Sequence, residues 1–128
     1  MKIKLVSVMV DDQKKALSFY TEKLGFKKKT EIDFGEALWL TLVSPEEPDG
    51  VELVLEPDSD PDAQTFKKAI FEKGIPWTAF YVDDIQKEFE RLKQLGVVFK
   101  SEPKKGDSEI SAIFNDTSGN FIQIYQLL

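Results

Sequence analysis

Apolar and polar residues alternate at the start of the chain, and the same pattern returns later. The run from Leu5 to Asp12 has the two-residue period of a β-strand and ends in Val-Asp-Asp. A second β-prone run that ends in Val-Asp-Asp begins at Trp77, 72 residues after Leu5. Each run leads into a helical pattern that stops at Leu-Gly, with the glycines at Gly25 and Gly96. This internal match predicts two copies of one structural unit.

The first copy is predicted to contain four strands and one helix. In the first strand, Val6, Val8 and Val10 share one face, which we expect to be buried against the helix. The pair Asp11-Asp12 is predicted to cap that helix, because a short carboxylate accepts hydrogen bonds from the first-turn amides. The predicted strands cover residues 4–10, 26–32, 37–43 and 51–56, and the helix covers 13–23.

The second copy repeats this order after a linker and a short helix that ends at Gly74. Its helix follows Asp83, which together with Gln86 suggests a capping box. The predicted strands cover residues 77–82, 97–100, 110–115 and 120–126, the helix covers 85–95, and 102–109 is expected to be a mobile loop.

Together these elements predict an α+β fold made of two tandem βαβββ modules. We expect one domain over residues 1–128, with module 1 at 1–57, a linker helix at 58–74 and module 2 at 75–128. The helices are expected to cover one face of a curved mixed sheet, so that the other face forms a concave pocket. A single module would leave this aromatic face exposed to water.

Composition narrows the function classes. The chain has 41% hydrophobic and 31% charged residues, as expected for a soluble globular protein. Its net charge of −6 disfavours nucleic acid and anionic membranes as partners. It contains no cysteine and no histidine, which excludes thiolate catalysis and removes the commonest general base and metal ligand. The N-terminal residues show no apolar signal segment, so we expect a cytoplasmic protein.

The predicted concave face combines aromatic side chains with a carboxylate. Glu52 is the notable member, because glutamate is rarely buried without a partner, and binding pockets pair apolar walls with few polar groups. A merely solvated Glu52 is the alternative. The lysine run 27–29 is expected to be a solvated strand edge. The predicted face consists of Leu5, Ser7, Met9, Trp39, Thr41, Glu52, Val54, Glu56, Trp77, Tyr81, Phe121, Gln123 and Tyr125.

The repeated Val-Asp-Asp strand ends, the segments 16–20 and 23–26, and the closing residues 116–120 resemble the vicinal oxygen chelate superfamily over essentially the whole chain. That superfamily includes glyoxalase I, extradiol dioxygenases, and bleomycin and fosfomycin resistance proteins. The resemblance implies its two-module fold and, for the antibiotic-binding members, a homodimer with pockets at the subunit interface. It does not by itself imply one function, because this fold supports many chemistries.

The resemblance also implies where a metal would bind. The enzymes of the superfamily hold a divalent metal with one residue from the first and one from the last strand of each module. Motif matching puts those places at Leu5, Glu52, Trp77 and Gln123. Leu5 and Trp77 offer no donor atom, and the remaining two oxygen ligands make a poor site. We therefore expect no metal and no other cofactor.

Three hypotheses follow. The first is a metal-free protein that binds a small organic molecule, cationic or aromatic, with no catalytic residue. The second is a metal-dependent lyase, isomerase or dioxygenase of the glyoxalase type, with Glu52 as its base. The third is an interaction domain without a ligand. For the first hypothesis, the predicted ligand-binding residues are Ser7, Trp39, Glu52, Trp77, Tyr81, Phe121, Gln123 and Tyr125.

Overall fold

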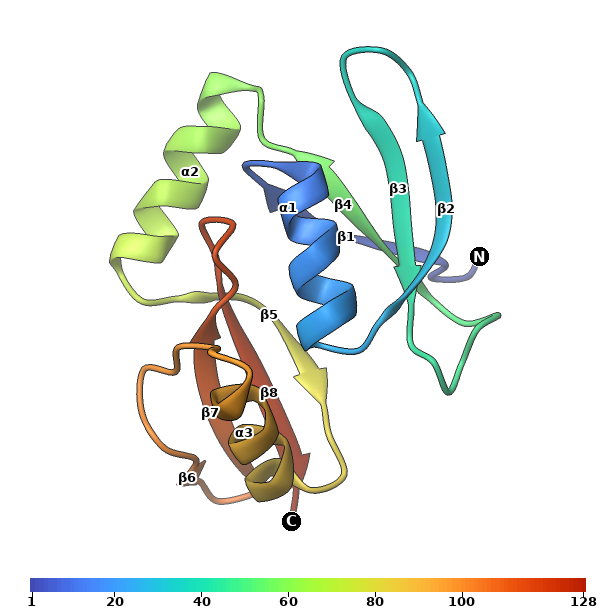
Figure 1. The fold of residues 1–128 in the computed structure, drawn as a ribbon. Helices are drawn as coiled ribbons and strands as arrows, with labels where there is room; N and C mark the ends of the chain where they lie inside the picture. Colours follow the sequence, from blue (N-terminus) through green and yellow to red (C-terminus); the bar gives the residue numbers. More distant parts are fainter. The chain divides into compact units, whose positions relative to one another are not determined.

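A computed structural model of the protein describes residues 1–128, and the chain divides into two compact units, Met1–Phe66 and Lys67–Leu128. The first unit contains a four-stranded sheet of order β1-β4-β3-β2 (Figure 1). Its first and last strands, β1 and β4, pair in parallel, and the other neighbours are antiparallel. The elements are β1 (Leu5–Val10), α1 (Gln13–Ser18), the π-helical turn η1 (Phe19–Lys23), β2 (Lys27–Asp33), β3 (Leu38–Val43) and β4 (Glu52–Pro57).

The second unit repeats this plan with the sheet order β5-β8-β7-β6, in which β5 and β8 pair in parallel. Helix α2 (Pro61–Glu72) runs across the boundary between the units. The other elements are β5 (Pro76–Tyr81), α3 (Ile85–Gln94), β6 (Lys104–Lys105), β7 (Glu109–Asn115) and β8 (Phe121–Leu127). The predicted α+β fold with two βαβββ modules is confirmed. None of the helices combines the length and apolar character needed to cross a bilayer.

The core of unit 1 lies between its helix and one face of its sheet (Figure 1). Alternation puts apolar residues of β1, β3 and β4 on this face, where they are buried with Ala16 and Tyr20 of the helical segment. These strand residues are Val8, Val10, Leu40, Leu42, Leu53 and Leu55. Val6 is an exception to the predicted valine face, because it lies near the start of the edge strand β1 and is 47% exposed.

Aspartates cap the helices of both units at equivalent positions. Asp12 accepts a hydrogen bond from the Lys15 amide at 3.1 Å, and Asp84 accepts one from the Lys87 amide at 3.1 Å. The predicted capping box of Asp83 with Gln86 is therefore wrong. Asp83 instead accepts a hydrogen bond from the Tyr81 hydroxyl, and the Gln86 side chain donates to Glu90.

Two other expectations for the second unit are wrong. Residues 97–100 form no strand, and only a single bridge joins Phe99 to Phe114. The Lys100 N–H donates to the Ile113 carbonyl at 2.8 Å and the Asn115 N–H donates to the Val98 carbonyl at 2.9 Å, but the pairing goes no further. The Phe99 ring also packs edge-on against Phe89 and Phe114. The expected loop 102–109 contains the short strand β6, which pairs with Ile110 and Ser111 of β7.

The sequence suggested that helices cover only one face of the sheet, but in the second unit they contact both faces. Helix α3 packs on the face that holds the buried residues Ile122 and Ile124. Phe71 of α2 stacks on Phe121, whose ring centroid is 4.4 Å away with nearly parallel planes. Because side chains alternate along β8, Phe121 belongs to the opposite face. The C-terminal half of α2 therefore covers one end of that face.

Gln13, the first residue of α1, connects the helix to two strands of the first sheet. Its amide nitrogen donates to the Leu38 and Leu55 carbonyls at 2.8 Å each, and its amide oxygen accepts from the Leu38 N–H at 2.9 Å. The β3–β4 ladder pairs Thr41 with Val54 and Leu42 with Leu53 and does not extend to Leu38. Gln13 thus supplies partners to backbone groups outside that ladder.

We predict that Gln13→Met lowers the free energy of unfolding by about 1–3 kcal/mol, because methionine keeps the side-chain length but leaves these backbone groups without partners. Denaturant unfolding measures the change. The control is Lys14→Met at the next, exposed position, which should have little effect. Equal stabilities of the two variants would contradict a structural role for Gln13.

Candidate functional site

The face of the first sheet opposite the helix carries the predicted residues of module 1. Strand register places Leu5 beside Glu52 and Ser7 beside Val54. Val54 is in turn paired with Thr41 of β3. These residues therefore share the open face of unit 1, which also includes Met9, Trp39 and Glu56.

Glu52 lies on this open face with both carboxylate oxygens engaged. Its Oε1 accepts a hydrogen bond of 2.8 Å from the hydroxyl of Thr41, a fully buried residue. Its Oε2 lies 3.9 Å from the Lys29 ammonium. The Glu52 side chain is only 20% exposed. The carboxylate is therefore partly buried and has two partners, Thr41 and Lys29, as a buried carboxylate requires.

Lys29 is a residue of this site that sequence reasoning missed, because a run of three lysines is typical of a solvated strand edge. Its ammonium also donates to the Pro48 carbonyl at 3.3 Å. Apolar surface lies on the same face, where Ile32 and Trp39 face each other across β2 and β3 and are 46% and 36% exposed. Unit 1 thus presents an anchored carboxylate together with exposed apolar side chains.

The open face of unit 2 carries Gln123 and Tyr125 of β8. Gln123 is paired with Ala79, and Tyr125 is paired with Tyr81. The two tyrosine rings meet edge-on, with centroids 5.8 Å apart. The Tyr81 hydroxyl donates to Asp83 at 2.9 Å, and this hydrogen bond and the negative charge of Asp83 raise the pKa of Tyr81 above its ordinary value.

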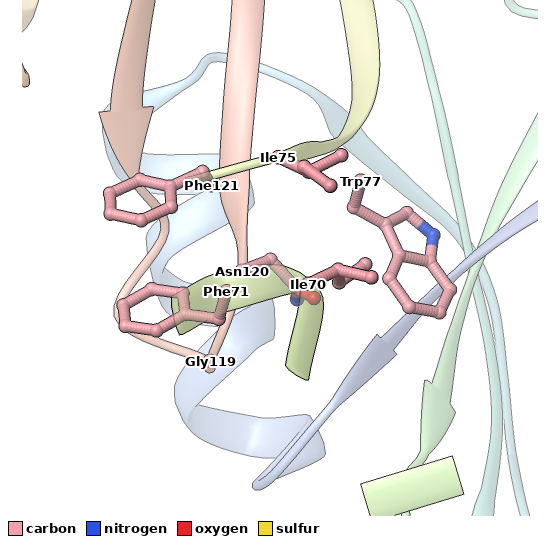
Figure 2. Close-up of a pocket in the computed structure, with 7 residues that line it drawn as sticks. All are labelled: Ile70, Phe71, Ile75, Trp77, Gly119, Asn120 and Phe121. Atoms are coloured by element: carbon pink, nitrogen blue, oxygen red, sulfur yellow. The ribbon is translucent and has the colours of Figure 1, made fainter. Parts of the chain in front are cut away.

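Trp77 and Phe121, two further predicted site residues, take part in packing within unit 2. The strand register shifts between Pro76 and Thr78, which places Trp77 at a local irregularity of the β5–β8 pairing. Figure 2 shows both residues around a shallow pocket of about 110 Å³, which has no enclosed space for a water molecule. Phe121 also lies under the Lys100 ammonium, 4.9 Å from the ring centroid. The other lining residues are Ile70, Phe71, Ile75, Gly119 and Asn120.

The residues at the four places matched to the family's metal ligands do not fit a divalent ion. Leu5 and Trp77 have no donor atom, and Glu52 already contacts Thr41 and Lys29. No group of three or more histidine, cysteine, aspartate or glutamate side chains is arranged to hold a metal. Gln123, the fourth place, is paired with Ala79 and not with Trp77.

Comparison with known proteins identifies the family. A family model described as the Glyoxalase/Bleomycin resistance protein/Dioxygenase superfamily matches residues 2–124. The chain belongs to this superfamily. The resemblance read from the repeated strand ends and the closing turn is therefore confirmed.

Relatives within this superfamily cover nearly the whole chain. The uncharacterized protein YurT of Bacillus subtilis is 53% identical over 126 residues, which are 98% of this chain and 99% of YurT. The crystal structure of UcmS2 has a TM-score of 0.84 at 35% identity, covering 98% of this chain and 97% of that one. TnmS3, an antibiotic binding protein from Streptomyces sp. CB03234, has a TM-score of 0.76 at 26% identity, covering 100% and 97%.

We predict that Asp83→Ala lowers the pKa of Tyr81 toward its ordinary value, because it removes both the acceptor and the negative charge. Since folding raises this pKa, the linked stability is present below the ordinary pKa of tyrosine and is lost as pH rises through the folded value. Ultraviolet titration of tyrosinate measures the shift, and Tyr81→Phe identifies the Tyr81 signal among the three tyrosines. An unchanged titration in Asp83→Ala would contradict the interaction.

Proposed function

We propose that this protein binds a small organic molecule, cationic or aromatic, without a metal, and thereby sequesters it. The observation that carries the proposal is the partly buried Glu52 carboxylate on a face with exposed apolar side chains, Ile32 and Trp39. A ligand with a positive charge and an aromatic body would satisfy both features. The antibiotic binding described for TnmS3 supports the same function class.

The predicted ligand contacts divide between the two units. In unit 1, Glu52 is the polar anchor, Trp39 is an apolar contact, and Ser7 offers a hydroxyl on the same face. In unit 2, Tyr81 and Tyr125 offer aromatic rings, and Gln123 offers an amide on their face. Trp77 and Phe121 support these contacts by packing within unit 2 and remain part of the proposal.

A metal-dependent lyase, isomerase or dioxygenase is the second candidate, and the retained carboxylate of Glu52 is the observation in its favour. The donor set counts against it, because two of the four matched places carry Leu5 and Trp77. We also propose a homodimer, as the resemblance to antibiotic-binding members of the superfamily implies. Light scattering of the purified protein would give its mass relative to the 14.6 kDa chain.

A thermal-shift screen separates these candidates. We expect one or more basic aromatic antibiotics to raise the melting temperature by several degrees, because a ligand that binds only the folded state stabilises it by mass action. Zinc, nickel and manganese should produce no such shift. A metal that remains bound in stoichiometric amount after dialysis would favour the enzyme, whereas no shift with any compound would favour an interaction domain.

We predict that Glu52→Gln weakens a cationic hit from this screen by about tenfold or more while folding is retained, since it preserves shape and removes the charge. The control is Glu56→Gln, which removes a carboxylate from the same strand and face. Trp39→Ala should weaken cationic and neutral ligands alike. Trp77→Ala should do the same and also lower stability, because Trp77 packs in unit 2.

Calorimetric titration of the four variants measures these affinities. If wild type, Glu52→Gln and both tryptophan variants bind with equal affinity, the ligand site lies elsewhere on the protein.

A further inference from the structure

A β-bulge places Lys29 beside Glu52. The pairing of β2 with β3 shifts between Lys28, which is opposite Leu42, and Thr30, which is opposite Thr41. Two consecutive residues of β2, Lys29 and Thr30, thus correspond to a single step along β3. The irregularity brings the Lys29 ammonium to the open face of unit 1, where it lies 3.9 Å from the Glu52 Oε2.

The neighbouring Lys28 lies on the other face. It is paired with Leu42, and its ammonium contacts Glu31 at 3.2 Å, a residue paired with Leu40. Leu40 and Leu42 belong to the buried helix-side face. Two adjacent lysines of one strand therefore pair with different carboxylates on opposite faces of the sheet, so one serves as a control for the other.

A hydrogen bond positions the Lys29 ammonium, and part of the Glu52 side chain remains accessible. Its hydrogen bond to the Pro48 carbonyl fixes it at the β3–β4 connection. Its distance of 3.9 Å from Glu52 exceeds hydrogen-bond length, so the attraction to the carboxylate is a charge interaction. The side chain is 37% exposed, and ion pairs with such exposure are weak. A ligand cation that forms a direct hydrogen bond would displace this interaction.

We propose that Lys29 determines specificity by competing with ligand cations for the Glu52 carboxylate. This inference rests on the proposed function, in which Glu52 anchors the ligand. Because Lys29 already offsets part of the charge of Glu52, a simple amine gains less by approaching it than it would at an unpaired carboxylate. The site therefore selects cations that are attached to an aromatic or apolar body, which adds contacts that Lys29 does not replace.

The test uses two probes with the same aromatic body: monodansylcadaverine, a primary amine, and its N-acetyl derivative, in which an uncharged amide replaces the ammonium. Fluorescence titration compares wild type, Lys29→Gln and the control Lys28→Gln. We expect Lys29→Gln to bind the amine up to about fivefold more tightly than wild type, the size of an exposed ion pair. The neutral probe should not distinguish the proteins, and Lys28→Gln should match wild type.

The double variant Lys29→Gln/Glu52→Gln separates competition from a general effect of net charge. If Lys29 acts through Glu52, its substitution should change amine affinity only when Glu52 is present. Tighter amine binding by Lys29→Gln in the Glu52→Gln background as well would overturn the proposal.

The remaining outcomes distinguish this inference from the proposed function. If Lys29→Gln binds the amine like wild type while Glu52→Gln binds it more weakly, competition is refuted and the anchor role of Glu52 stands. If Glu52→Gln also binds like wild type, or if no protein binds either probe, both ideas fail for this class of ligand. Circular dichroism of each variant checks that the fold is retained.

Discussion

Parallel pairing of the first and last strands in each module is the constraint on which the rest of the structure depends. Parallel neighbours cannot be joined by a tight turn and need a long connection, which in each module consists of a helix and two further strands. In unit 1 the pairing sets Leu5 beside Glu52, and in unit 2 it sets Tyr81 beside Tyr125. Residues about 45 positions apart in the sequence thereby become neighbours on one face.

The open face of unit 1 illustrates how a polar group is retained on a sheet. Burial of a carboxylate is costly unless it is paired and hydrogen-bonded. Thr41 supplies the hydrogen bond from within the sheet, and Lys29 supplies the opposite charge from the edge strand. The same arrangement leaves part of Glu52 accessible, so the structural requirement and the proposed binding role are met by one set of side chains.

Much of the fold was predictable because the same pattern of strand, Val-Asp-Asp and helix occurs twice in the sequence. The strand ends at Asp12 and Asp84 and the alternation of the valines predicted the modules, and with them the face that carries Glu52. The bulges were not predictable, since a bulge appears in a sequence only as a break in the alternation of apolar and polar residues, and the lysine run 27–29 has no alternation to break. They decide the environments of Lys29 and Trp77. The strand expected at 97–100 did not form, because an apolar run beside a sheet resembles a strand even when it pairs with its neighbour at a single bridge.

The two modules also differ in how their helix is joined to their last strand. In unit 1 the side chain of Gln13 on the helix reaches the Leu55 carbonyl. In unit 2 the equivalent helix position is Ile85, whose backbone N–H donates to the side chain of Gln126 on β8 at 2.9 Å. The glutamine has thus changed sides between the copies. If the modules descend from one ancestral sequence, converting one form into the other takes at least two substitutions. The intermediate then has either no glutamine or two glutamines at this junction.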